Sequence, residues 1–104
     1  MTSTMIYVTT SSREEALRIG RVVVADRLAA CANVLPGITS VYKWQGEVRE
    51  DVETALILKT RSDLVERLTA RVKELHSYDC PCVVALPITD GNPDFLQWIA
   101  EETR

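Results

Sequence analysis

Hydrophobic and polar positions change their spacing several times along the chain. Apolar and β-branched residues fill positions 5–9, which predicts a short strand. Ser12 then stands three residues before Glu15, the form of a helix capping box. Behind it, six residues at steps of three and four predict one apolar helix face: Ala16, Leu17, Gly20, Val23, Val24 and Leu28. The chain is therefore expected to begin with a strand and an amphipathic helix.

Two long extended segments are predicted next. They cover Cys31–Trp44 and residues 47–60, and Gln45-Gly46 between them forms a tight turn because glycine accepts a positive φ. Pro36-Gly37 interrupts the first segment, and proline cannot donate to a strand ladder, so this strand is expected at an edge or with a bulge. Residues 54–58 are apolar enough to be buried on both faces, as in a central strand.

The rest of the chain predicts a helix, a strand and a last helix. Ser62-Asp63 begins a helix whose apolar residues keep the helical period at Leu64, Leu68, Val72 and Leu75. Residues 82–88 form the fourth predicted strand, and Pro87 again indicates an edge. Asn92-Pro93 supplies a cap and a first helical residue for the last helix.

This order of elements predicts an α+β fold. Two split βαβ units give a ferredoxin-like sandwich, with an antiparallel sheet of strand order 4-1-3-2, helices on one face and an extra C-terminal helix. The second and fourth strands are the edges in that order, and they are the ones that contain Pro36 and Pro87. A length of 104 residues suits one domain with one core, residues 1–104.

The long hairpin between the second and third strands does not fit a lone domain. At about 3.3 Å per residue, residues 47–60 span roughly 46 Å, whereas a domain of this size is about 34 Å across. Apolar side chains also gather near its tip, at Val41, Tyr42, Trp44 and Val48. An overhanging ribbon with exposed aromatic residues favours strand pairing with another copy of the chain.

Charge and composition exclude several classes of partner. Twelve Lys and Arg against fifteen Asp and Glu give a net charge of −3, which argues against a nucleic-acid or anionic-membrane surface. No apolar run approaches the ~20 residues of a membrane span. The N-terminus shows no signal peptide and the cysteine count is odd, at three, so we expect free thiols in the cytoplasm.

Candidate metal ligands cluster after the second predicted helix. Cys80-Pro-Cys82 is a C-x-C pair, and in extended chain both side chains point the same way and can meet one soft cation. His76 adds a third donor, but no second pair completes a tetrahedral zinc site. Alternatively, Cys82 is a small buried residue, Cys80 a loop residue, and His76 caps the C-terminus of its helix.

A lysine and a run of acids give weaker signals. Lys59 ends a strand that looks buried, so its ammonium needs an acid, such as Glu53 or Asp79, or an anionic ligand. The acids of residues 47–53 either attract cations weakly or keep the ribbon solvated. Nucleotide-binding, hydrolase and metalloprotease motifs are missing, so we do not expect an enzyme.

Several stretches together resemble one known family. They are residues 28–33 with Pro36-Gly37, residues 42–44 with Gly46, residues 53–60, residues 76–78 with Pro81, and Trp98-Ile99. In this order and spacing the chain resembles the CutA family of divalent-cation-tolerance proteins. The resemblance implies a homotrimer built like the PII signalling proteins, with a role in tolerance to copper and other divalent metals and no established enzymatic activity.

The resemblance also implies a cleft between subunits, around Lys59, Tyr78, Trp44 and Trp98. The chain departs from the family at Ser77, where proline is usual, at Cys82, where glutamate is usual, and at Thr9, where some members have cysteine. A site formed by His76, Cys80 and Cys82 is therefore expected to be softer, with Cu(I) or Zn(II) as candidate ions and no obligatory cofactor.

Three functions remain open at this point. The first is a cytoplasmic trimeric metal-tolerance protein. The second is a PII-like regulatory module that binds a small anion at Lys59 and His76 and docks an unidentified protein partner. The third is a stable structural trimer without a dedicated ligand.

Overall fold

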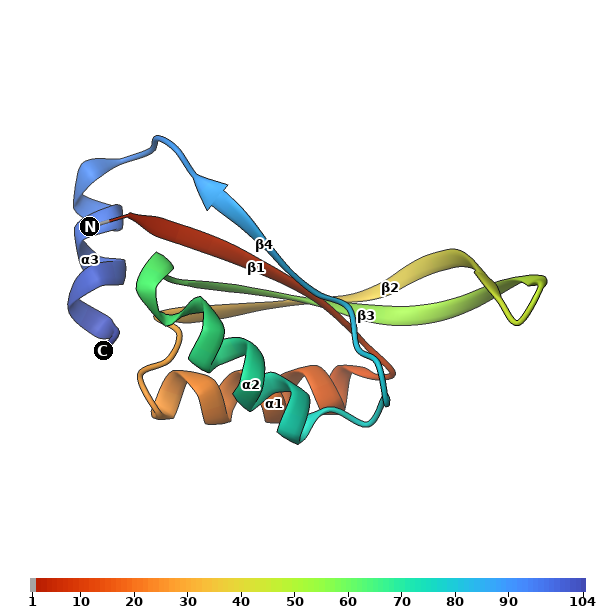
Figure 1. Ribbon diagram of the computed structural model, residues 1–104. Helices are drawn as coiled ribbons and strands as arrows, with labels where there is room; N and C mark the ends of the chain where they lie inside the picture. The colour runs from red at the N-terminus through yellow and green to blue at the C-terminus, as the bar shows by residue number, and fades with distance from the viewer. Residues whose placement is uncertain (1) are drawn as a thin grey trace.

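The structure is a computed structural model that describes residues 2–104. Its elements are β1 (Ser3–Thr10), α1 (Arg13–Ala25), β2 (Cys31–Trp44), β3 (Glu47–Arg61), the 3₁₀ turn η1 (Ser62–Leu64), α2 (Val65–Leu75), β4 (Val83–Ile88) and α3 (Pro93–Glu102). The four strands form one antiparallel sheet in the order β2-β3-β1-β4 (Figure 1). The predicted α+β fold and strand order are confirmed.

The start of the second helix differs from the prediction. Ser62 does not cap it, because its hydroxyl pairs with the hydroxyl of Thr4 at 2.6 Å and its N–H donates to Thr2. The chain makes η1 instead, and α2 begins at Val65 without a side-chain cap. By contrast, Ser12 and Asn92 cap α1 and α3 as predicted.

The core lies between the sheet and the two helices α1 and α2, which cover the same face (Figure 1). Its fully buried side chains include Ile6, Ile19, Leu56, Leu58 and Leu68. Helix α1 approaches the sheet closely at Gly20, where a Cβ atom would lie 3.0 Å from that of Ala32. These contacts fix the end of β1 and the N-terminus of α1, which both border the cleft described below.

Both proline predictions are confirmed. The register of β2 against β3 shifts between Leu35 and Ile38, so the bulge leaves out Pro36 and Gly37, the latter with a φ of 82°. Pro87 lies on β4, which is an edge strand. Cys82 lies just before β4 because the ladder between β1 and β4 ends at Val83.

The β2–β3 hairpin overhangs its own sheet. Residues 54–61 of β3 pair with β1, and residues 55–59 of that segment also pair with β2, whereas residues 47–53 pair with β2 alone. We call residues 38–53 the ribbon, and Figure 1 shows it extending well beyond the helices. The molecule accordingly measures 44 × 25 × 22 Å. The predicted overhang is confirmed, and its apolar residues Trp44, Val48 and Val52 are exposed in this chain.

The second face of the sheet is the one that α1 and α2 do not cover. Its side chains alternate along the strands with the buried ones, and the register places Tyr7 between Ile57 and Val84, and Met5 beside Leu86. Val84 and Leu86 are 50% and 46% exposed. We call this set, Met5, Tyr7, Ile57, Val84 and Leu86, the open face.

Candidate functional site

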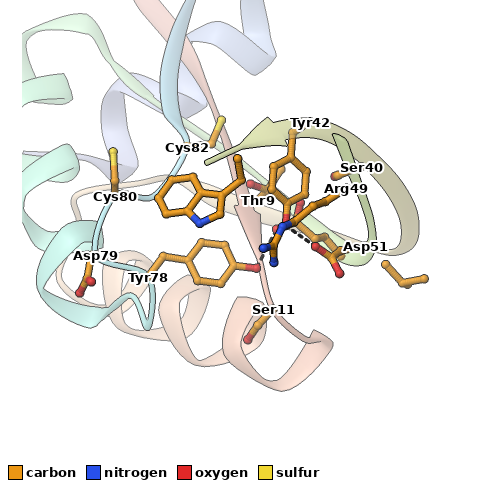
Figure 2. A pocket seen from close by; sticks show the side chains of 13 residues that line it. Thr9, Ser11, Ser40, Tyr42, Arg49, Asp51, Tyr78, Asp79, Cys80 and Cys82 are labelled. Carbon is orange, nitrogen blue, oxygen red and sulfur yellow. Dashed lines mark hydrogen bonds between the residues drawn. The ribbon is translucent and has the colours of Figure 1, made fainter. Parts of the chain in front are cut away.

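A cleft of about 690 Å³ lies between the ribbon and the segment that follows α2 (Figure 2). Its lining comprises Thr9, Ser11, Ser40, Tyr42, Trp44, Arg49, Asp51, Val52, Glu53, Tyr78, Asp79, Cys80 and Cys82. One wall therefore comes from β2 and β3, and the other comes from the loop between α2 and β4. The remaining two residues are Thr9 on β1 and Ser11 just after the end of that strand.

Tyrosine hydroxyls hold carboxylates in the lining. Tyr78 Oη donates to Glu53 Oε2 at 2.7 Å, and this bond joins the loop to the ribbon. Tyr42 Oη donates to Asp51 within the ribbon. Burial and the bond to Glu53 raise the pKa of Tyr78, so its hydroxyl stays protonated and keeps donating at neutral pH. The hydrogen bond to Asp51 likewise raises the pKa of Tyr42.

The cleft carries a negative charge. Asp51, Glu53 and Asp79 line it against one cation, Arg49, which lies 3.8 Å from Glu47 on the same strand. Carboxylates grouped in a concave surface attract cations, and their oxygens are ligands for divalent ions. The lining thus favours a cation over an anion.

His76 anchors the loop that carries the second wall. Its ring is buried, and its Nε2 lies 2.8 Å from the carbonyl oxygen of Thr9. Its Nδ1 accepts the N–H of Tyr78 at 3.0 Å, so Nε2 carries the proton and donates to Thr9. Both nitrogens are used within the chain, and the ring packs against Tyr78 with centroids 4.7 Å apart. His76 therefore positions Tyr78, and it does not cap the helix with its side chain.

Glu15 ties the same loop to α1, a role that the capping-box pattern did not reveal. Its carboxylate accepts the Ser77 N–H at 2.7 Å and the N–H and hydroxyl of Ser11 at 2.9 Å each. Burial alone raises the pKa of Glu15, but the bonds from Ser11 and Ser77 outweigh it and lower the value to about 2. Arg18 lies 3.8 Å away and His76 Nδ1 3.9 Å away. We call Glu15 and His76 with these bonds the polar clamp.

Of the residues predicted for a site, the structure brings four together in the cleft: Trp44, Tyr78, Cys80 and Cys82. The other residues lie elsewhere. Trp98 is on α3 and stacks with Phe95 at 5.4 Å. Lys59 contacts neither expected acid within residues 2–104. It donates to Asn33 Oδ1 at 2.6 Å, because the register pairs Lys59 with Cys31 and so places Asn33 diagonally across on the same face of the sheet.

The thiols are free and accessible. Cys80 and Cys82 are both exposed, so the alternative of a buried Cys82 is wrong, because β4 begins only at Val83. In the part of the chain that is described, no group of three or more His, Cys, Asp or Glu lies close enough to hold a metal ion. His76, Cys80 and Cys82 therefore do not form a three-ligand group in a single chain.

Comparison with known proteins identifies the family. Residues 4–102 match the family model described as CutA1 divalent ion tolerance protein. The chain belongs to the CutA1 family. It is 48% identical over 99 residues to the divalent-cation tolerance protein CutA of Thermus thermophilus, covering 95% of this chain and 96% of that protein. It is 47% identical over 102 residues to the chloroplastic protein CutA of Arabidopsis thaliana.

Solved CutA1 structures share the whole fold. CutA1 from Oryza sativa superimposes with a TM-score of 0.97 at 45% identity, covering 100% of this chain and 95% of that one. The Thermus thermophilus protein gives a TM-score of 0.95 at 46% identity, covering 98% and 99%. The match to the Arabidopsis protein covers 98% of this chain but only 56% of that protein, so the chain spans little more than half the length of this relative.

The compartments named for relatives of this CutA1 chain vary. The plant relatives are described as chloroplastic, and a solved CutA from Archaeoglobus fulgidus, 42% identical, as periplasmic. Within residues 2–104, no helix combines the length and the apolar character that crossing a membrane requires.

Proposed function

We propose that this CutA1 chain is a cytoplasmic homotrimer that binds divalent cations, copper among them, in the cleft and contributes to metal-ion tolerance. The observation that carries the proposal is the excess of carboxylates over cations in the cleft lining. Because no three such groups lie close enough to hold an ion within residues 2–104 of one chain, we propose that a neighbouring copy completes the ligand set. Relatives named for divalent-cation tolerance support the same class of ligand. The family is not a known enzyme family, and we propose a binding role without catalysis.

Two surfaces support assembly. The open face presents Val84 and Leu86 half-exposed. Burying such side chains against a second copy stabilises the assembly by about 25 cal/mol for each Å² of apolar surface removed from water. The ribbon supplies Trp44, Val48 and Val52 on strands whose outer edges have no partner within residues 2–104. Copies of the chain that cover both surfaces would also enclose the cleft. The three free cysteines suit a reducing cytoplasm.

The alternative of a PII-like anion site has less support. Lys59 is bonded to Asn33, and both nitrogens of His76 are already used within the chain. An anion in the cleft would also meet three carboxylates. A purely structural trimer has no use for this charge excess.

Native mass spectrometry of untagged, metal-free protein tests assembly and binding together. We expect one species of three times the 11.7 kDa chain mass, which gains Cu(II) when the ion is added. A monomer at micromolar concentration contradicts the trimer, and unchanged mass on addition of Cu(II) contradicts the cation site.

Charge removal in the cleft locates the site. Asp51→Asn with Glu53→Gln is expected to weaken Cu(II) binding, measured by isothermal titration calorimetry, because it removes two lining carboxylates. Glu66→Gln, an exposed acid of α2 outside the cleft, is the matched control and is expected to bind like the parent chain. Equal affinity in all three proteins contradicts the cleft as the site.

A further inference from the structure

Two exposed thiols lie in the cleft, and the divalent-cation proposal does not need them. Cys80 and Cys82 are free, and both line the same cavity. The third thiol, Cys31, is half-buried at the start of β2, where its sulfur lies 3.8 Å from Lys59 Nζ, and it is not part of the lining. The chain therefore has a matched pair of accessible thiols and one remote thiol.

The local backbone allows both sulfurs to reach one ion. Only Pro81 separates Cys80 from Cys82, and this segment lies between α2 and β4, outside every helix and strand. Figure 2 shows the two side chains leaving the backbone toward the same side. Because no strand ladder fixes the segment, rotations about the side-chain bonds can bring the sulfurs to a common ion.

We propose that Cys80 and Cys82 form a two-coordinate thiolate site for a soft monovalent cation, and that Cu(I) is the ion that fits it. Each thiol loses its proton when its sulfur bonds the ion, so one Cu(I) displaces two protons and no electron is transferred. This inference goes beyond the proposed function, because it concerns a monovalent ion and requires neither divalent binding nor the trimer.

The number of available donors selects the ion. Zinc in structural sites takes four ligands, usually in a tetrahedron, and residues 2–104 bring no third His, Cys, Asp or Glu to this pair. His76 is the nearest imidazole in sequence, but Thr9 and Tyr78 already use its two nitrogens. Thiolates are soft ligands, which favour Cu(I), an ion stable with two sulfur ligands, over hard divalent ions.

The polar clamp fixes the position of the backbone just before the two cysteines. Ser77 and Tyr78 are held by Glu15 and His76, so the segment reaches the cleft from a rigid anchor two residues before Cys80. The thiols themselves stay free of the clamp, because no hydrogen bond from Cys80 or Cys82 is found among the described residues. They are thus placed in the cleft but are not committed to another contact.

Anaerobic titration of the reduced protein with Cu(I) against a competing chelator tests the proposal. We expect one Cu(I) per chain, two protons released, a thiolate-to-copper absorption band in the ultraviolet and two sulfur neighbours by X-ray absorption. Cys80→Ser with Cys82→Ser is expected to lower the affinity more than about 100-fold, beyond the 10–100-fold typical for loss of a supporting residue.

Cys31→Ser is the matched control, since it removes one thiol outside the cleft and is expected to leave binding unchanged. Retained Cu(I) affinity in the double variant, or loss of affinity in Cys31→Ser, overturns the proposal. So does Zn(II) displacing Cu(I) at equal concentration. Light scattering gives the oligomer mass of each variant alongside its Cu(I) affinity. Loss of the trimer changes that mass, whereas loss of the thiol site lowers the Cu(I) affinity at unchanged mass, so the two outcomes are distinguishable.

Discussion

The two halves of β3 show how differently one strand can be used. Residues 54–61 pair with β1 under the helices and residues 55–59 also pair with β2, and Leu56 and Leu58 are fully buried there. Residues 47–53 continue the same strand, yet Val48 and Val52 are 73% and 72% exposed. The first half belongs to a core that the chain completes alone. The second half offers apolar surface that the chain does not cover, and it forms a wall of the cleft.

The largest effect is expected from the buried half. Leu58→Ala removes a fully buried side chain from the core and is expected to lower the free energy of unfolding by about 2–5 kcal/mol, measured by urea denaturation. Val48→Ala, on the half that is exposed in a single chain, is expected to change it by less than about 0.5 kcal/mol where light scattering gives a monomer, and by more in the proposed trimer, where a neighbouring copy covers the ribbon.

In the monomer, a loss of stability for Val48→Ala as large as that for Leu58→Ala would contradict the comparison between the two halves of β3. In the trimer, the size of the loss measures how strongly a neighbouring copy covers the ribbon.

Glu15 gives the next largest effect, because it joins the core helix α1 to the cleft loop. The Glu15 pKa is about 2 in the folded chain and 4.5 ordinarily. A depressed carboxylate pKa stabilises the fold above the ordinary value, and that stability is lost as the pH falls from 4.5 toward 2. The shift corresponds to about 3 kcal/mol, measured as the unfolding free energy between pH 6 and pH 2.

Glu15→Gln is expected to remove this part of the acid dependence, and Glu14→Gln, an exposed acid in the same helical turn, is expected to retain it. An unchanged acid profile in Glu15→Gln would contradict the clamp.

The same contrast explains how much the sequence predicts. The spacing of apolar residues and the positions of the prolines predicted the strands and the sheet order, and the length of the extended segments predicted the overhang. Each of these signals is carried by residues that are close together along the chain. The clamp depends on contacts over 62 residues between Glu15 and Ser77 and had only a local capping signal. Instead of returning to Ser12, as a capping box does, Glu15 reaches Ser11 and the distant loop.

The candidate site was predicted in part for a similar reason. Trp44, Tyr78 and the two cysteines of the cleft were singled out from the sequence. Asp51 was considered only as part of an acidic run with weak attraction for cations, and Asp79 only as a partner for Lys59, so the sequence did not predict that both line one cleft. Lys59 looked like an unpaired buried cation. Its amide partner, Asn33, depends on the β2–β3 register, which the bulge at Pro36 sets.

A smaller effect is expected where the two regions meet. Tyr78→Phe removes the 2.7 Å hydrogen bond to Glu53 and is expected to lower the free energy of unfolding by about 0.5–1.5 kcal/mol. It also frees Glu53, so that Cu(II) affinity is expected to rise if the carboxylate is a ligand. Tyr42→Phe, whose bond to Asp51 lies within the ribbon, is the control for loss of a phenol without loss of the link. A larger loss of stability in the control would place the main polar contact inside the ribbon instead.

The smallest effect is expected from Ser77→Ala, and it separates the backbone from the side chain in the clamp. The bond to Glu15 comes from the Ser77 N–H, which alanine keeps. The free energy of unfolding and its acid dependence are therefore expected to stay within about 0.5 kcal/mol of the parent chain. A loss of more than about 1 kcal/mol would mean that the Ser77 hydroxyl group also stabilises the fold. A proline at this position would have no N–H to donate, so the contact with the Glu15 carboxylate requires that residue 77 is not proline.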